Sequence, residues 1–342
     1  MVSIKDVAEK AGVSDQTVSR VVHNDAKVDP RTRKRVERAI AKLGYVPNRA
    51  ARMVRTNRSG VVALVTNSVS TTPFSTDIVR GVRDAIEATP YSLLTITTGS
   101  EPERRARCWK TVKEHRCDAV IFVTMYHRQV EEAELDPAVP TVLVNCSLEN
   151  DRPVPAIVPD DYQGSYDAAA LAFEHGHSRI GYVRLNQTIL AARLREAGVR
   201  DLMRAKELMP REDWFVEGLV GKVFEDRYVA YENAMKILSL EDRPTVMLCG
   251  NDELALQVFS AAQTLGLRVP QDLSIVGFDD FQVISDVIRP GLTTMALPYY
   301  EMGQRAVRDV VKLIEKQPVE TVRTAVPCVP VLRQSLQRLN RV

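Results

Sequence analysis

The sequence predicts an α/β protein with a small helical head at its N-terminus and a body of two lobes, each built on a doubly wound parallel sheet. Three observations carry this prediction. The chain of 342 residues is long enough for a head and a much larger body. In the head, apolar residues recur at helical spacing. From Val61 onward, short apolar runs alternate with amphipathic stretches, which is typical of strands buried on both faces and joined by helices.

The first two expected helices lie at the N-terminus. Ser3 can cap the first helix, with Asp6 completing an approximate capping box, and Gly12 supplies a left-handed residue that ends it. Ser14 then caps a second helix, whose Val18 faces the first. Two helices joined by so tight a turn form a helix-turn-helix, whose second helix enters the major groove of DNA. An ordinary helical hairpin with solvated charges is the alternative.

The charge distribution favours DNA binding over the plain hairpin. Residues 1–60 contain 14 Lys and Arg against 6 Asp and Glu, a net charge of +8. The whole chain has 46 against 44, so the remaining residues carry −6. A basic head on an acidic body is expected of a DNA-binding module attached to a part that avoids DNA. The exposed face of the second helix carries Asp15, Gln16, Ser19 and Arg20.

A third helix completes the head, and a short basic segment follows it. Asp29 caps this helix with Pro30 at its first position, and Gly44 ends it. Residues 47–56 come next, rich in alanine and arginine, with Asn48 as a possible cap. This segment is too short to be a stable helix alone in water, so it can become helical on contact with DNA, and a plain linker is the alternative. The residues that close the three-helix core are Val36, Ile40 and Leu43.

The body alternates strands and helices. The expected strands are Val61–Thr66, Leu93–Thr97, Ala119–Val123, Thr141–Val144, Ile157–Val158, Ile180–Val183, Val246–Cys249 and Ser274–Gly277. The expected helices include Ile78–Ala88, Tyr162–His175, Arg227–Leu240 and Glu253–Leu265. These strands are too many for one comfortable sheet, so we expect two lobes with a ligand cleft at the carboxyl ends of their strands.

The sequence lacks the motifs of several common functional classes. There is no G-x-G-x-x-G after the first body strand, and no P-loop, H-E-x-x-H or G-x-S-x-G motif. A helix that ends on His175 and Gly176 explains the His-Gly-His run better than a metal site does. The five scattered cysteines are typical of reduced thiols, and no stretch resembles a signal peptide or a membrane span. We therefore expect a cytoplasmic protein without metal or cofactor, which is not an enzyme.

Four polar residues are candidates for the cleft. Asp160, Asn251 and Asp279 each follow a predicted strand, where they can bind ligand hydroxyls or act as acid and base. Helix capping is the alternative, and it suits Asn251. Arg195 faces the same cleft if the segment after Val183 crosses its mouth.

Over nearly its whole length the chain resembles the lactose/galactose repressor family of bacterial transcriptional regulators. The matching segments are IKDVAEKAGVSDQTVSRVV, LGYVPNRAARMVR, FEHGHSRIGYV, RPTVMLCGNDELALQ, LGLRVPQDLSIVGFDDF and LTTM. The resemblance implies a helix-turn-helix head (1–46), a hinge helix with a linker (47–60) and a body like a periplasmic sugar-binding protein (61–342). It implies an N-lobe of about 61–158 and 292–320 and a C-lobe of about 159–291 and 321–342.

The resemblance also implies a homodimer on near-palindromic, double-stranded operator DNA. Asp15 and Gln16 match the pair that selects operator bases, and Arg20 matches the major-groove arginine. Val54 stands where the family usually has a leucine wedged between base pairs, and the shorter valine implies a shallower wedge. Contacts near the DNA backbone are implied for Thr17, Ser19 and Asn24. The other expected DNA-binding residues are Ser14, Asn48, Arg52, Met53 and Arg55.

For the small-molecule effector, the resemblance implies a sugar, polyol, sugar acid or nucleoside-like compound and a regulated catabolic or transport operon. Fewer polar side chains before Arg195 than in relatives indicate a smaller polyol or a ligand with an apolar face. A solute receptor, an enzyme with the same body fold, or control by a protein corepressor are the alternatives. The effector-binding residues implied are Phe74, Asp160, Arg195, Phe224, Asn251 and Asp279.

Overall fold

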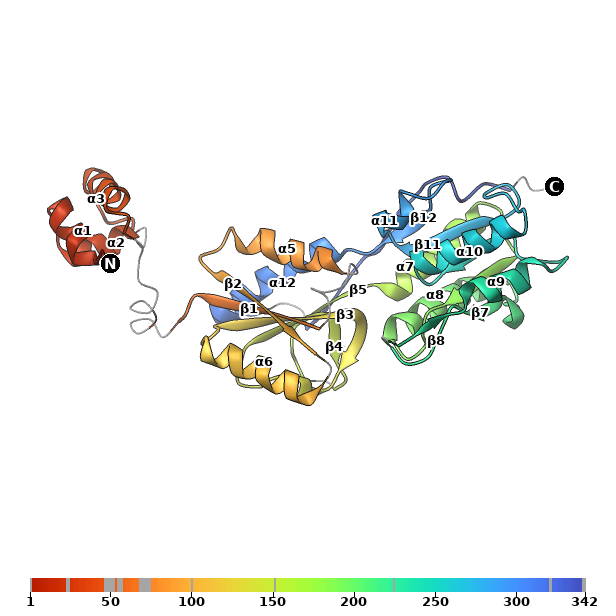
Figure 1. Ribbon diagram of the computed structural model, residues 1–342, viewed down its shortest axis with the longest axis horizontal. Helices are drawn as coiled ribbons and strands as arrows, with labels where there is room; N and C mark the ends of the chain where they lie inside the picture. The colour runs from red at the N-terminus through yellow and green to blue at the C-terminus, as the bar shows by residue number, and fades with distance from the viewer. Residues whose placement is uncertain are drawn as a thin grey trace. The chain divides into compact units, whose positions relative to one another are not determined.

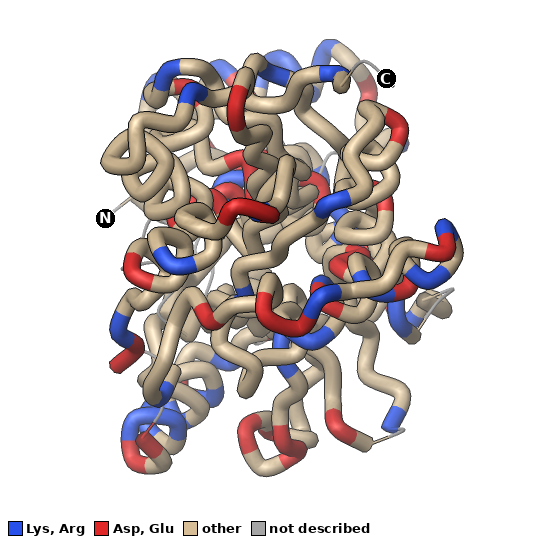
Figure 2. The backbone as a smooth tube through the Cα atoms, turned by 90° about the vertical axis from the view of Figure 1, so that its right-hand side faces the viewer, with Lys and Arg blue, Asp and Glu red and all other residues tan. Residues whose placement is uncertain are grey.

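The chain divides into two compact units, Met1–Ser59 and Gly60–Val342, which we call the head and the body (Figure 1). A computed structural model describes residues 2–22, 25–45, 53, 58–67, 75–99, 101–150, 152–223, 225–319 and 322–339. Short stretches of Lys and Arg and of Asp and Glu are scattered over a backbone that consists mostly of other residues (Figure 2). In the described part of the chain, no helix is long and apolar enough to cross a membrane.

The helices of the head are α1 (Ile4–Ala11), α2 (Asp15–Val22) and α3 (Pro30–Leu43). The expected caps are confirmed: Ser3 and Asp6 form a capping box, and Gly12 ends α1 with a φ of 62°. The Oγ of Ser14 accepts a hydrogen bond from the backbone N–H of Thr17 at 3.2 Å. These caps fix the tight turn between α1 and α2 because they satisfy backbone groups that the helices cannot pair internally.

One valine from each helix forms the centre of the head. Val7, Val18 and Val36 have no exposed surface, and Ile40 and Leu43 pack against the same cluster. The expected three-helix core is therefore confirmed. Because this core takes up the inner face of α2, the outer face of that helix is left polar.

The N-lobe of the body contains a parallel sheet in the order β13-β5-β4-β3-β1-β2. Its strands are β1 (Val61–Asn67), β2 (Ser92–Thr98), β3 (Ala119–Val130), β4 (Thr141–Leu148), β5 (Ala156–Pro159) and β13 (Arg323–Val326). Helices α5 (Thr76–Ile86) and α12 (Tyr299–Ile314) share one apolar cluster with the sheet, and α6 (Pro102–Glu114) shares another. Val62 and Leu64 belong to the first cluster, Ala63 and Val65 to the second. This alternation shows a sheet buried on both faces.

The C-lobe contains the second sheet, in the order β14-β12-β11-β10-β6-β7, parallel except for β14. Its strands are β6 (Ile180–Arg184), β7 (Phe215–Glu217), β10 (Val246–Cys249), β11 (Ser274–Asp279), β12 (Thr293–Ala296) and β14 (Val329–Val331). Its helices are α7 (Asp161–Glu174), α8 (Leu190–Ala205), α9 (Ala230–Leu238), α10 (Asp252–Thr264) and the short α11 (Gln282–Ser285). Helices α7 and α8 contribute to one apolar cluster, and α9 and α10 to another. Both lobes therefore have the predicted doubly wound architecture.

The expected lobe boundaries are wrong in two places. Residues 292–320 are expected in the N-lobe, and α12 does pack there, but β12 pairs with β11 in the C-lobe sheet. Residues 321–342 are expected in the C-lobe, and β14 does pair with β12 there, but β13 pairs with β5 in the N-lobe sheet. The described chain therefore passes between the lobes after β5, after β12 and after β13. The sequence pattern predicts neither β12 nor β13 as a strand, and the pairing partner of a strand is set by packing between distant segments.

Each of the eight expected strands falls on an observed one, and one expected helix differs. The helix expected from Arg227 begins at Ala230, because Arg227–Tyr228 forms β9, which pairs with β8 (Leu219–Val220). The strands that are not among the expected ones are β7, β8, β9, β12, β13 and β14. All five cysteines are free thiols, and four of them are buried. Short 3₁₀ turns complete the described elements: Glu132–Glu134 and Glu212–Trp214.

Candidate functional site

The first candidate site is the outer face of α2. Asp15, Gln16 and Arg20 are exposed there, while Val18 and Val21 are buried against the head core. Arg20 lies 3.9 Å from Asp25, but its side chain is still 55% exposed. Polar side chains that can donate and accept hydrogen bonds therefore lie on one surface of a rigidly packed helix, as base recognition in a groove requires. Thr17 and Ser19 are half-buried at the edge of this surface.

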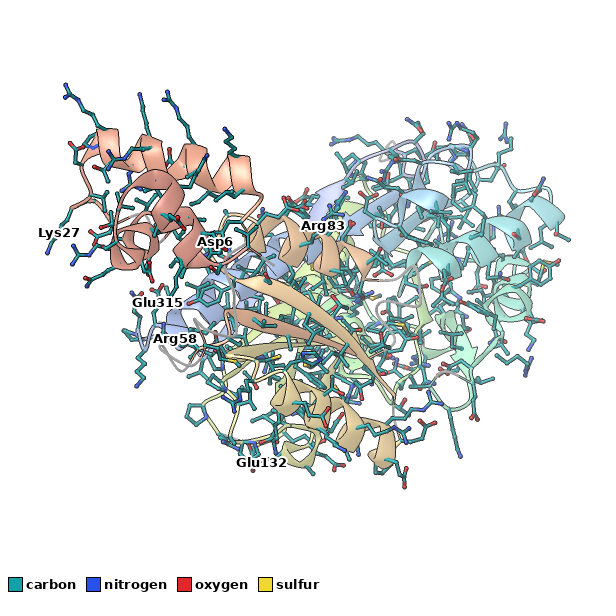
Figure 3. The ribbon with its side chains drawn as sticks, turned by 60° about the vertical axis from the view of Figure 1, so that its left-hand side comes forward. Asp6, Lys27, Arg58, Arg83, Glu132 and Glu315 are labelled. Atoms are coloured by element: carbon teal, nitrogen blue, oxygen red, sulfur yellow. The ribbon has the colours of Figure 1, made fainter. Side chains whose placement is uncertain are left out.

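Helix α3 adds positive charge to the head. Long side chains with nitrogen at their tips project from the head helices (Figure 3). Arg33 instead points inward and donates a hydrogen bond to the backbone oxygen of Asp25 at 2.6 Å, which ties α3 to the segment after α2. Exposed cations attract the phosphate backbone of nucleic acid whatever its sequence. The exposed basic residues of α3 are Arg31, Lys34, Arg35, Arg38 and Lys42.

Several predicted site residues lie outside the described part of the chain. Met53 is the one described residue of the segment 46–57. The predicted residues without a described position are Asn24, Asn48, Arg52, Val54, Arg55, Phe74 and Phe224.

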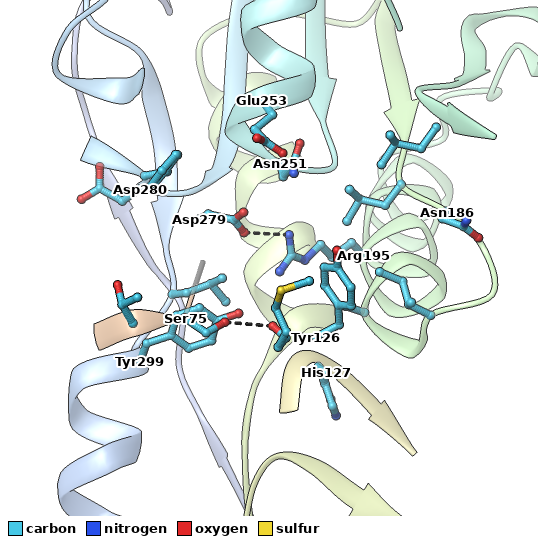
Figure 4. A pocket seen from close by; sticks show the side chains of 18 of the residues that line it. Ser75, Tyr126, His127, Asn186, Arg195, Asn251, Glu253, Asp279, Asp280 and Tyr299 are labelled. Carbon is cyan, nitrogen blue, oxygen red and sulfur yellow. Dashed lines mark hydrogen bonds and ion pairs between the residues drawn. The ribbon is translucent and has the colours of Figure 1, made fainter. Parts of the chain in front are cut away.

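The second candidate site is a cavity of about 470 Å³ between the lobes of the body (Figure 4). Ser75, Tyr126 and Tyr299 line it from N-lobe elements, and Arg195 and Asp279 line it from the C-lobe. This volume suits a small molecule, and the place, where the two sheets meet, is where two-lobed α/β proteins hold ligands. Among the described residues, no group of His, Cys, Asp and Glu is arranged to hold a metal ion.

Arg195 is the central charge of the cavity. Its Nε donates to Oδ1 of Asp161 at 2.7 Å, and its Nη1 donates to Oδ1 of Asp279 at 3.0 Å and to the carbonyl of Gly250 at 2.6 Å. The guanidinium also lies 3.8 Å from the ring centre of Phe278. Burial disfavours its charge, but Asp161 and Asp279 outweigh this effect and raise the pKa of Arg195 above its usual range. The residue is therefore a permanent, almost fully enclosed cation.

Asp161 links this cation to the N-lobe. Its Oδ2 lies 2.6 Å from Nδ1 of His127, which is on β3, while Asp161 begins α7. Burial raises the pKa of this carboxyl, but Arg195 and His127 more than reverse the effect and lower it. Asp161 is completely buried and His127 is 2% exposed. His127 Nε2 has no hydrogen-bond partner among the described residues. A buried polar contact thus joins the two lobes beside the cavity.

Asp279 ends β11 in an unusual backbone conformation. Its φ is 117°, a value that residues with a Cβ rarely adopt, and its side chain is 24% exposed. Burial raises the pKa of this carboxyl to about 6, against the opposing effect of Arg195. Local backbone strain of this kind often marks a ligand-binding position.

Of the two remaining predicted pocket residues with a described position, one lines the cavity and the other does not. Asn251 caps α10 by accepting a hydrogen bond from the N–H of Leu254 at 2.9 Å, and it also lines the cavity. Asp160 caps α7 through the N–H of Gln163 and does not line the described cavity. Its neighbour Asp161 makes the contact with Arg195 instead, so the residue predicted from the sequence is one position before the one that makes this contact.

Sequence reasoning missed much of the cavity lining. Glu253 is two residues beyond Asn251, in the first turn of α10, and that spacing could have identified it. Asp226 and Tyr228 come from the β8–β9 hairpin, which no pattern in the sequence predicts. Tyr126 lies beyond the expected end of β3, and burial raises the pKa of its phenol to about 12. At neutral pH this phenol is uncharged.

Comparisons with known proteins match both the head and the body of the chain. The signature of bacterial regulatory proteins of the lacI family matches residues 3–48, and that of a periplasmic binding protein-like domain matches residues 168–336. Catabolite control protein A of Priestia megaterium is 32% identical over 338 residues, which is 98% of this chain and 99% of that protein.

Two solved structures extend the similarity to the fold. A crystal structure of a putative LacI-family transcriptional regulator from Rhizobium etli is 40% identical, with a TM-score of 0.78, and covers 82% of this chain and 100% of its own. The lac repressor dimer, bound to operator and the anti-inducer ONPF, is 26% identical, with a TM-score of 0.76 over 98% of this chain and 99% of its own.

Proposed function

The chain belongs to the lacI family of bacterial regulatory proteins, and on that premise we propose that it is a transcriptional repressor. It binds double-stranded operator DNA as a homodimer and changes its operator affinity in response to a small-molecule effector. The exposed polar face of α2 on a basic, capped head is the observation that carries this proposal. The protein acts in the cytoplasm and performs no catalysis.

In the proposed DNA complex, Asp15, Gln16 and Arg20 contact base edges in the major groove, since they are exposed on α2. Val54 enters the minor groove as a wedge between base pairs. Contacts near the DNA backbone come from Ser14, Thr17, Ser19 and Asn24, and the hinge contributes Asn48, Arg52, Met53 and Arg55.

The interlobe cavity is the proposed effector site. Arg195, Asn251 and Asp279 bind the effector from the C-lobe, and Phe74 and Phe224 complete the proposed contacts. The similar lac repressor structure holds both an operator and a small molecule, which supports the same pairing of functions here. A hydroxylated small molecule suits the cavity better than a protein corepressor does, because the central cation Arg195 is only 4% exposed and a protein surface cannot reach it. The regulated genes encode catabolism or transport of that compound.

The test selects binding sites for the full chain from a pool of random DNA duplexes and then measures affinity at several salt concentrations. A near-palindromic site is expected because a symmetric dimer reads two half-sites. The logarithm of affinity falls steeply with the logarithm of salt concentration, by a slope of about −0.9 for each phosphate neutralised. Failure to enrich any sequence, or a slope near zero, contradicts the proposal.

A further inference from the structure

The interlobe cavity has an acidic lining. Arg195 is the one Lys or Arg among the lining residues in the described part of the chain. Negative charges inside a partly closed cavity repel an anionic ligand more strongly than they would in open water. The lining carboxylates are Asp77, Asp226, Glu253, Asp279 and Asp280.

The charge of Arg195 is already more than neutralised. The guanidinium binds both Asp161 and Asp279, so one positive charge faces two negative ones. Asp280 has its own cation outside the lining, since Arg333 Nη2 lies 2.8 Å from its Oδ1. The cavity therefore offers an anionic ligand no cation that is free of carboxylate partners.

Two further carboxylates are bound only by neutral donors in the described structure. Glu253 Oε2 accepts a hydrogen bond from the hydroxyl of Tyr228 at 2.6 Å. Asp226 accepts one from the side-chain amide of Asn186. A neutral donor satisfies a lone pair but leaves the negative charge in place. Glu253 and Asp226 therefore contribute net negative charge to the cavity.

These carboxylates converge on an aromatic part of the cavity. The charges of Asp226, Glu253 and Asp279 act together on the Tyr126 hydroxyl, adding to the effect of burial on its pKa. Tyr228, Phe281 and Tyr299 line the same cavity. Figure 4 shows Glu253, Asn251 and Asp279 gathered near Arg195, with Tyr126 and Tyr299 facing them. Carboxylates beside aromatic rings form an environment that favours an organic cation through ion pairing and cation–π attraction.

We propose that the effector of this cavity is a hydroxylated amine, protonated at neutral pH, such as an amino sugar or an amino polyol. This inference rests on the proposed function and narrows its ligand class. The ammonium group donates hydrogen bonds to Glu253 and Asp226, and the hydroxyl groups bind Asn251 and Asp279. A neutral sugar would cover these carboxylates without a counter-charge, and a sugar acid would add a further negative charge.

The test compares matched compounds that differ in one group, using thermal melting and calorimetry of the full chain. The sets are D-glucose, D-glucosamine and D-glucuronate; D-galactose, D-galactosamine and D-galacturonate; and D-glucitol, D-glucamine and D-gluconate. In at least one set the amine binds about tenfold or more tightly than the neutral compound, as one additional charge-assisted hydrogen bond predicts. The acid in that set produces no melting shift.

Substitution of Glu253 links the preference to the structure. Glu253→Gln keeps an oxygen for the Tyr228 hydroxyl but removes the charge, so affinity for the amine falls about tenfold while affinity for the neutral compound changes little. Asp226→Asn is a second variant with the same expected pattern. Glu241→Gln is the control, because Glu241 is exposed on the body and does not line the cavity.

The outcomes separate this inference from the proposed function. Tightest binding by a neutral or acidic compound overturns the amine assignment and leaves a ligand-responsive repressor. Equal losses for amine and neutral compounds in Glu253→Gln also overturn it, since charge is then not what Glu253 contributes. Binding by no compound overturns the ligand class, whereas failure of the full chain to select DNA contradicts the proposed function itself.

Discussion

Arg195 and Asp161 form a buried ion pair. Removal of one partner from such a pair strongly destabilises the fold, because the other group stays buried without it. The side chains are 5% and 0% exposed, so neither charge can turn to water if its partner is removed. The adjacent Asp160 only caps α7. Two neighbouring aspartates of the same chemistry therefore have different structural importance.

Replacement of these two aspartates by alanine tests that difference. Asp161→Ala leaves two buried groups, Arg195 Nε and His127 Nδ1, without their hydrogen-bond partner, which lowers the free energy of unfolding of the body by about 3–5 kcal/mol. Asp160→Ala removes an N-cap and costs about 1 kcal/mol. Urea denaturation followed by circular dichroism measures both values. Equal losses for the two variants would show that Asp161 is only another cap.

The raised pKa of Asp279, about 6, predicts a dependence of stability on pH. The folded protein holds this proton more tightly than the unfolded chain, whose carboxyl has its usual value near 4. The stabilising contribution is therefore complete below pH 4 and is lost as pH rises through 6. Relative to Asp279→Asn, the parent protein should lose melting temperature between pH 4 and pH 7. A constant difference over that range contradicts the assignment of this titration to Asp279.

Helix α2 shows how an element can be fixed by one face and act with the other. Val18 and Val21 pack into the head core, and Ser14 caps the helix through Thr17. The position of Arg20 on the exposed face of α2 is thereby set by the fold before any DNA is bound. A change at Arg20 should alter recognition without disturbing the helix, because its side chain is 55% exposed.

Arg20→Ala should weaken operator binding by about 1–3 kcal/mol and relax discrimination at the base pair that Arg20 contacts. Fluorescence anisotropy on the selected operator and on single-base variants measures both effects. Arg179→Ala is the matched control, because Arg179 is an exposed arginine of the body. Equal losses on operator and random DNA would make Arg20 a phosphate contact instead.

The features that can be predicted well from the sequence are those that depend on residues close together in the chain. Ser3, Gly12 and Asn251 were identifiable as capping residues because capping depends on neighbours in the chain. The lobe positions of β12 and β13 could not be predicted, because each pairs with a strand distant in sequence or reached by a crossover. The cavity shows the same division: Asp279 follows a clear strand, whereas its contact with Arg195 joins residues 84 positions apart.

In the body as a whole, a segment that connects the two lobes lies beside the cavity, so a change at the cavity in one lobe can affect the other lobe there. The chain passes from the N-lobe to the C-lobe between β5 and α7, where Asp161 lies. His127 reaches that residue from β3 of the N-lobe. An effector that engages Arg195 therefore acts on a group that two hydrogen bonds, through Asp161, connect to His127 of the N-lobe.

His127 lines the cavity but is not among the residues that we propose to bind the effector, so it should transmit effector binding between the lobes without being needed for binding itself. Coupling between two sites is measured as the ratio of operator affinities with and without effector, and it typically amounts to about 5–150-fold. His127→Leu keeps an apolar volume in the buried position but cannot hydrogen-bond Asp161. We expect the variant to bind effector nearly as well as the parent and to show a ratio much closer to one.

The measurement uses operator titrations at zero and saturating effector, beside calorimetry of effector binding. His115→Ala is the control, since His115 is exposed in the N-lobe and does not line the cavity. If the role of His127 is purely structural, His127→Leu lowers the melting temperature, but the folded protein keeps the same ratio of operator affinities with and without effector. An unaltered ratio in His127→Leu would therefore show that the lobes communicate through contacts other than the one between His127 and Asp161.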